Sequence, residues 1–257
     1  MRNTVCLALL AVLLLGSCAS RVVVKEEQRA AEVPRFSDAP LGPPMIQGWN
    51  PWFMSRFARH TEYRVVDSDA GRVLEARAVS SSSGLLLDIN VNPREKPLLS
   101  WTWKATELMA DADTTRLGND DSPTRIAIAF DGDRSKFDVE DRAMASMVRL
   151  VSGREMPYAT IIYVWDNKLP VDSLFEHPRS SRVRVIVAES GPARVGQWLK
   201  FTRNIEEDFR RAFDEEPGRV ESVGVLTDSN STGHNIVSYY GDIEFHAAAR
   251  ATSVAGR

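Results

Sequence analysis

Apolar and polar residues alternate along much of this chain, and this alternation is typical of a β-strand with one buried face. In residues 84–91, for example, Leu85, Leu87 and Ile89 alternate with polar positions such as Asp88. Similar patterns predict strands over residues 62–67, 72–79, 84–91, 98–104, 125–130, 183–187, 220–227 and 237–245. Turn-forming clusters separate the first three, which indicates antiparallel sheets with one dry face and one wetter face. Residues 158–165 are apolar on both faces, which predicts a central strand covered on both sides.

Two segments follow a helical period instead. In residues 137–151, Met144, Met147 and Val148 recur at a spacing of three and four, and Gly153 follows as a stop signal. A second helix is predicted over residues 205–213, with Asn204 as its N-cap. We expect both helices to lie outside the sheets.

The stretch before the first strands is irregular in its pattern. Residues 36–53 hold four prolines and the tryptophans Trp49 and Trp52, and are too rigid for a helix. We expect this segment to lie against the sheets, with the two indoles as anchors. The whole pattern predicts an all-β fold, a β-sandwich of jelly-roll type with two peripheral α-helices. It should form a single domain over residues 35–247, followed by a frayed tail, 248–257.

The N-terminus has the layout of a secretion signal. Arg2 precedes an apolar run over residues 5–15, and Leu15-Gly16-Ser17-Cys18 resembles a lipoprotein cleavage box. The apolar run is shorter than the roughly 20 residues that a membrane-spanning helix needs. We therefore predict a signal peptide over residues 1–17, lipidation at Cys18 and a tether over residues 18–34. This would place the protein in the bacterial envelope, on the outer membrane facing the periplasm. An ordinary secretory signal cut near residues 19–20 is the alternative.

Charge and cysteine content restrict the partners. The chain has 257 residues, 32 basic and 35 acidic side chains and a formal net charge of −3. Loss of residues 1–17 removes Arg2 and Cys6, which leaves one cysteine and no possible disulfide within the mature chain. Both signs of charge are interspersed, without the basic stripe that phosphate backbones require, so we expect no nucleic-acid partner. The composition gives no indication of the oligomeric state.

Most of the candidate chemistry lies in residues 219–246. Two predicted strands flank a polar loop formed by Asp228, Ser229, Asn230, Ser231 and Thr232. If the second strand alternates regularly, its core face carries Tyr239, Ile243 and Phe245. Its opposite face then carries Tyr240, Asp242, Glu244 and His246. We predict this second face to be the one that meets a ligand or solvent.

Two further groups are ligand candidates. Trp101 and Trp103 share one face of a strand, and could form a flat surface on which sugar rings stack or part of the core. Adjacent Asp120 and Asp121, with Arg125 beyond them, could bind a metal or a substrate hydroxyl, or form a solvated turn.

Metal binding, if present, should involve calcium. Calcium accepts six to eight oxygen ligands, and the candidates are Asp228, Asn230 and Asp242, with Asp38. Turns rich in Asp and Asn also bind their own backbone, which is the competing interpretation. Zinc is less well supported, because the four histidines are scattered and no cysteine remains to join them.

Common catalytic motifs are absent from the sequence. It contains no Gly-x-Ser-x-Gly elbow, no phosphate-binding glycine loop with a lysine and no dinucleotide fingerprint. The chain does resemble an uncharacterised bacterial family, domain of unknown function 3047. The resemblance rests on Trp101-Thr-Trp103, Asp120-Asp121, Tyr163-Val-Trp165, Trp198 before Asn204, Asp228-Ser-Asn230-Ser-Thr232 and Tyr239-Tyr-Gly-Asp-Ile243. It implies an architecture and no activity. The final strand is also similar to those of galactose-binding-like jelly rolls, in which an aspartate often helps to bind a structural calcium.

These observations favour non-catalytic binding of a glycan or another envelope component on one sheet face. A polysaccharide-active enzyme is the main alternative. A glycosidase could use Glu244 with Asp120 or Asp121 as acid and base. A lyase could use Tyr240, His246 and Arg125. A purely structural envelope protein is the third possibility.

Overall fold

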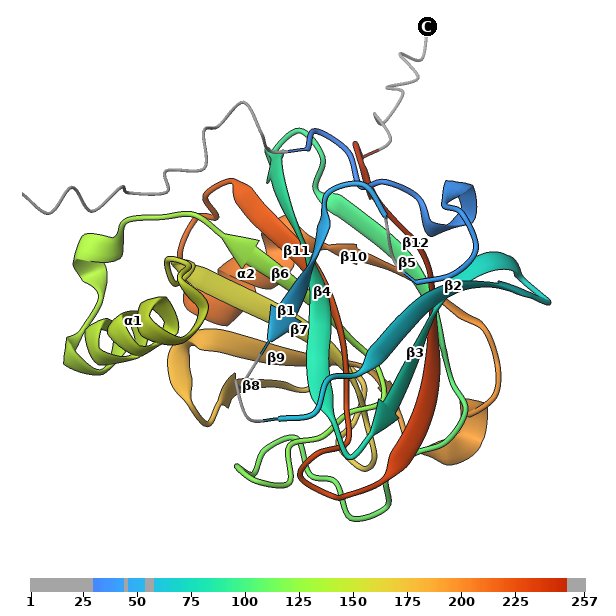
Figure 1. The fold of residues 1–257 in the computed structure, drawn as a ribbon. Helices are drawn as coiled ribbons and strands as arrows, with labels where there is room; N and C mark the ends of the chain where they lie inside the picture. The colour runs from blue at the N-terminus through green and yellow to red at the C-terminus, as the bar shows by residue number, and fades with distance from the viewer. Residues whose placement is uncertain (1–29, 44–45, 54–57, 249–257) are drawn as a thin grey trace, which may run out of the picture.

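A computed structural model describes residues 30–43, 46–53 and 58–248, which form a sandwich of two β-sheets (Figure 1). In spatial order, the seven-stranded sheet contains β1 (Trp49–Phe53), β4 (Ser82–Val91), β11 (Val220–Asp228), β6 (Arg125–Phe130), β7 (Ala159–Asp166), β9 (Ser180–Ser190) and β8 (Leu174–His177). The five-stranded sheet contains β10 (Leu199–Asn204), β5 (Leu98–Ala105), β12 (Asn235–His246), β3 (Gly71–Val79) and β2 (Glu62–Ser68). The predicted all-β sandwich of jelly-roll type is confirmed.

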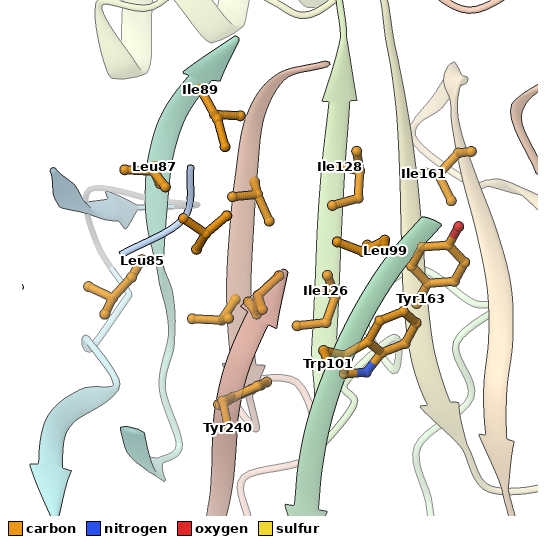
Figure 2. Close-up of a cluster of buried hydrophobic side chains, with 14 of the residues drawn as sticks. Leu85, Leu87, Ile89, Leu99, Trp101, Ile126, Ile128, Ile161, Tyr163 and Tyr240 are labelled. Atoms are coloured by element: carbon orange, nitrogen blue, oxygen red, sulfur yellow. The ribbon is translucent and has the colours of Figure 1, made fainter. Parts of the chain in front are cut away.

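The core lies between the two sheets. Figure 2 shows side chains of β4, β6 and β7 meeting side chains of β5 and β12 in this space. Leu87 and Ile128, from the seven-stranded sheet, are 1% and 0% exposed, and Leu99 on the opposite sheet is 0% exposed. Burying a side chain of this size stabilises a fold by about 1.5–3 kcal/mol relative to leaving it in water. Burial of the apolar side chains that alternate along these strands is therefore the main source of the stability of the sandwich.

Three strands were not predicted. β1 lies in the segment expected to be irregular, and it pairs antiparallel with β4, from Trp49 opposite Leu87 to Phe53 opposite Ser83. It stands at the end of the sheet order, a position that tolerates Pro51, which has no N–H to donate. β8 and β10 also lie at sheet edges, where short strands give a weak periodic signal.

Both predicted helices are present. α1 (Val139–Ser152) begins at the N-cap Asp138 and ends at Gly153, which adopts a left-handed φ of 72°. α2 (Ile205–Phe213) begins at Asn204, whose side-chain oxygen accepts hydrogen bonds from the N–H groups of Glu206 and Glu207, both at 3.2 Å. α1, at the left of Figure 1, stands outside the sandwich. Short 3-10 turns occur at Phe36–Asp38, Arg134–Lys136 and Pro192–Arg194.

Residues 30–43 form a strap that touches both sheets. Ala30 pairs with β4 by donating to the Asp88 carbonyl and accepting from the Asn90 N–H, at 3.1 and 3.0 Å. Phe36 is buried in the core, and Gly42 forms an antiparallel bridge with Val65 of β2. Ordered packing therefore includes residues 30–34, which the sequence assigned to the tether.

Within the residues that the structure describes, neither helix is long and apolar enough to span a membrane. The predicted signal peptide, Cys18 and most of the predicted tail lie outside those residues.

Candidate functional site

The β12 strand places its side chains differently from the prediction. Tyr240, expected on the ligand-binding face, is 0% exposed and points into the core (Figure 2). Tyr239, expected in the core, lies half-buried on the outer face beside Trp198, with ring centroids 6.1 Å apart. The pairing of β12 with β5 shifts between Tyr240 and Ile243, so a β-bulge there lets both residues point inward. The prediction for Tyr239 and Tyr240 was wrong because it assumed an unbroken alternation.

Asp242 binds the N-terminal strap. Its carboxylate accepts hydrogen bonds from the N–H and the hydroxyl of Ser37, at 3.0 and 2.7 Å, and from Arg35 Nε at 3.0 Å. Glu244 binds Arg35 Nη2 at 2.9 Å, and His246 Nε2 lies 3.7 Å from Glu244. These contacts make Asp242 and Glu244 a clamp between β12 and the strap.

Trp101 and Trp103 belong to the core. The two indoles are 1% and 0% exposed, with centroids 5.6 Å apart in an edge-to-face arrangement, and Trp101 also stacks on Phe201. A sugar ring cannot reach either face, so the predicted stacking surface at these residues is wrong. The competing interpretation, that large aromatics in strands form core, is the one that holds.

Arg125 is the centre of a buried polar cluster. It is 6% exposed, its guanidinium lies 3.2 Å from Asp228, and it also donates to the Asp120 carbonyl. Asp228 accepts from the Ser122 N–H at 3.0 Å, and burial raises the pKa of its carboxyl to about 7 despite the Arg125 charge. These contacts fix the loop before β6 against the end of β11.

Asp121 has a similar structural role. It is 2% exposed and accepts hydrogen bonds from the N–H groups of Ser231 and Thr232 and from the Thr232 hydroxyl. It therefore caps the β11–β12 loop.

His177 closes the outer side of this cluster. Its Nδ1 accepts from the Arg179 N–H at 3.2 Å, and its Nε2 lies 3.8 Å from Asp120. Burial, and then the Arg125 charge, lowers the pKa of His177 to about 4. The cavity between His177, Asp120 and Arg125 has a volume of about 10 Å³, room for about one water molecule. A sugar does not fit there, so Asp120 and Arg125 do not form the predicted ligand site in this structure.

The predicted calcium ligands do not converge. Asp228 is buried against Arg125, Asp242 faces the strap on the opposite sheet, and Asn230 is exposed. Asp38 is exposed in the 3-10 turn of the strap. Among the described residues, no group of three or more histidines, cysteines, aspartates or glutamates is arranged to hold a metal ion.

A different surface has the geometry of a binding site. Trp52 of β1 lies against the seven-stranded sheet over Gly84 and Gly224. A Cβ atom added to Gly84 would lie 3.0 Å from the Trp52 ring, and one added to Gly224 would lie 3.2 Å from it. Both glycines belong to the sheet face turned away from the core, since their neighbours Leu85 and Val225 point into it. A side chain at Gly84 would also clash with the Val225 carbonyl, and one at Gly224 would lie 3.3 Å from the Leu85 carbonyl, so the two glycines allow both the neighbouring strand and the indole to approach closely.

We call this surface the Trp52 groove. It is open, with a volume of about 340 Å³, and is lined by Asn50, Pro51, Trp52, Phe53, His60, Leu86, Ser152 and Arg154. Phe53 is 43% exposed and stacks on His60, with ring centroids 4.1 Å apart. Arg154, just after α1, binds Asp88 of β4 through two nitrogens. The groove thus combines aromatic rings with polar groups from three separate parts of the chain.

Sequence reasoning identified Trp52 as an anchor but not as a ligand-binding residue. The available signal was the Trp49–Trp52 spacing. Two residues that are three positions apart on a strand point to opposite faces of the sheet. Because Trp49 is buried in the core, Trp52 lies on the outer face.

Several solved structures are similar to this chain at low identity. The K2 cleaved adhesin domain of Lys-gingipain has 8% identity and a TM-score of 0.41, covering 85% of this chain and 99% of its own. The xyloglucanase domain of NopAA, a type three effector from Sinorhizobium fredii, has 11% identity and a TM-score of 0.41, covering 82% and 99%. A carbohydrate-binding module of the CBM28 type, specific for non-crystalline cellulose, has 9% identity and a TM-score of 0.39, covering 85% and 95%.

A search of curated proteins finds no match. The family model described as "Protein of unknown function (DUF3047)" matches residues 47–244, most of the chain and nearly all of the sandwich. This agrees with the resemblance seen in the sequence. The chain belongs to the DUF3047 family.

Proposed function

We propose that this protein is a non-catalytic glycan-binding protein and that the Trp52 groove is its binding site. The observation that carries the proposal is the Trp52 ring, which lies along the outer sheet face over two glycines at the floor of an open groove. A flat aromatic surface of this kind suits the apolar face of a sugar ring, and polar groups at its rim suit the hydroxyls.

The size of the groove agrees with this use. Its volume of about 340 Å³ falls at the lower end of the roughly 300–1,000 Å³ typical of small-molecule sites. Asn50 at the rim is exposed, and its side-chain nitrogen donates to the Gly48 carbonyl, which leaves its amide oxygen as an acceptor. Stacking on Trp52 and hydrogen bonding at Asn50 can therefore act on the same ligand.

The enzyme alternative has less support. Glu244 lies on the outer face of the five-stranded sheet and binds Arg35, whereas Asp120 and Asp121 lie in the loop before β6 of the other sheet. Tyr240 and Arg125 are buried while His246 is 41% exposed. Neither predicted acid–base set is assembled, and none of these residues lines the groove.

The cellular location is also a proposal. The lipoprotein-like sequence Leu15-Gly16-Ser17-Cys18 favours a lipid anchor at Cys18, which would present the sandwich from the outer membrane to the periplasm. A glycan-binding domain on such an anchor could contact polysaccharides of the cell envelope.

The test is a binding screen on neutral and acidic oligosaccharides, with Kd values from calorimetry and product analysis in the same samples. Trp52→Ala should weaken binding by about 2 kcal/mol or more, roughly thirtyfold in Kd, because truncating a central aromatic residue removes most of its contact area. Trp198→Ala, which removes a half-buried tryptophan near Tyr239 on the other sheet, is the matched control. If Trp198→Ala abolishes binding and Trp52→Ala does not, the glycan binds to the five-stranded sheet and the Trp52 groove is not the binding site. Turnover of any oligosaccharide would instead favour the enzyme alternative.

A further inference from the structure

Arg154 stands at the rim of the Trp52 groove with part of its hydrogen-bonding capacity unused. Its Nη1 donates to Asp88 Oδ2 at 3.2 Å, and its Nη2 donates to Asp88 Oδ1. The side chain is 43% exposed. Within the described part of the chain, its Nε donates to no partner.

The planar geometry of a guanidinium leaves Arg154 able to bind a second carboxylate. The group is planar and carries five N–H donors, and two of its edges can each bind a carboxylate through two parallel hydrogen bonds. Asp88 occupies the edge formed by the two terminal nitrogens. The edge formed by Nε and the second hydrogen of Nη2 remains available.

Asp88 also holds Arg154 in place. A long side chain that is already fixed loses less conformational entropy when it binds a ligand. Because Asp88 neutralises its charge, Arg154 would recognise a carboxylate chiefly through directed hydrogen bonds and less through net charge.

The charges of the groove are consistent with an acidic ligand. Among the described residues that line it, Arg154 and His60 are those that can carry a positive charge, and none carries a carboxylate. The Asp88 carboxylate, which is not part of the lining, is paired with Arg154, so an anionic group at the free edge of Arg154 meets a carboxylate whose charge is already neutralised.

We propose that the Trp52 groove selects glycans that contain uronic acids. The sugar ring stacks on Trp52, and its carboxylate, which projects from the ring edge, pairs with the free edge of Arg154. This inference rests on the proposed function of the groove and adds the chemical class of its ligand.

The test compares hexamers of galacturonic acid with their methyl esters, which share the same backbone and differ in charge. The acid form should bind about tenfold more tightly, the usual effect of a hydrogen bond to a charged group. The double variant Arg154→Gln/Asp88→Asn removes both charges of the pair together and should bring the two Kd values together. Arg154→Lys keeps the charge but loses the planar fork, and should lose most of the preference.

The outcomes separate the two proposals. Equal or tighter binding of the ester, or an acid preference that survives in the double variant, would overturn the selectivity. Binding of neutral glucan or xylan hexamers alone would overturn it while leaving glycan binding at Trp52 intact. If Trp52→Ala leaves the binding of both forms unchanged, the groove is not the site and both proposals fail. Tighter binding of a sulfated hexamer than of the galacturonate would also contradict the assignment of carboxylate as the recognised group.

Discussion

Two buried groups of the Arg125 cluster should give opposite pH dependences of stability over the same range. Burial, followed by the Arg125 charge, lowers the pKa of His177 to about 4. Burial also raises the pKa of Asp228 to about 7, and neighbouring Asp121 adds to the shift while Arg125 opposes it. Both groups are therefore largely uncharged in the folded protein between these two values.

The sign of each effect follows from which state binds the proton. As pH falls from 6.5 to about 4, the unfolded chain protonates His177 and the folded protein does not, so stability is lost as pH falls. As pH rises from 3.8 to about 7, the folded protein keeps a proton on Asp228 that the unfolded chain has released, so stability is lost as pH rises. At roughly 1.4 kcal/mol per unit of pKa shift, the effects are about 3 kcal/mol for His177 and about 4 kcal/mol for Asp228. In the parent protein they largely cancel.

Single substitutions should separate the two contributions. His177→Gln leaves the Asp228 effect unopposed, so its free energy of unfolding should fall, relative to the parent, as pH rises from 4.5 to 7. Asp228→Asn leaves the His177 effect unopposed and should show the reverse. The measurement is urea denaturation followed by tryptophan fluorescence at several pH values, with the free energy extrapolated to water.

A control variant isolates the role of burial. His246→Gln removes a histidine that is 41% exposed on the other sheet, and its pH profile should follow that of the parent. If the His177 and Asp228 variants change the slope in the same direction, or if neither changes it, the opposite pKa shifts assigned to these two groups are wrong.

Four further predictions concern other parts of the molecule. Asn204→Ala should lower the free energy of unfolding by about 0.5–2 kcal/mol, measured by urea denaturation, because it removes the N-cap of α2. Asp242→Ala breaks three hydrogen bonds to the strap and should lower the free energy of unfolding by about 1–3 kcal/mol, seen by calorimetry as a fall of several degrees in Tm. Added calcium should not change the Tm of the parent protein. Gly224→Ala should weaken glycan binding severalfold by calorimetry and lower the Tm, because its methyl carbon would lie 3.1 Å from Leu86 Cδ1, 3.2 Å from the Trp52 ring and 3.3 Å from the Leu85 carbonyl oxygen. Cys18→Ser should move the protein out of the membrane fraction or leave the precursor uncleaved, and normal processing with membrane sedimentation would contradict lipidation.

The predicted strands are those in which alternation and burial coincide. β6 was predicted at its observed bounds because Ile126, Ile128 and Phe130 alternate with small or polar residues and all three face the core. β1 was missed because local signals from proline predicted irregular structure, whereas pairing with β4 stabilises the segment. Such pairing is a tertiary effect that no local pattern contains.

The candidate site was harder to predict for two reasons. The bulge in β12 exchanges the faces of Tyr239 and Tyr240, and a period of two cannot reveal an inserted residue. The Trp52 groove brings β1 and the nearby His60 together with Leu86 and Arg154, which lie far along the sequence from them. Gly84 and Gly224 acquire their role only when the sheet order places them under the same indole.

Asp88 connects the strap to the Trp52 groove, so a force on the strap can reach the rim of the groove. Its carbonyl accepts the Ala30 N–H, and its carboxylate holds Arg154. A pull on the chain ahead of Ala30 would therefore load β4 at Asp88, next to the groove rim. Because Ala30 runs parallel to β4, a force along the strand shears its two hydrogen bonds together instead of opening them one at a time. Tension applied ahead of Ala30 would thus reach β4 at Asp88, the residue whose carboxylate holds Arg154 at the groove rim.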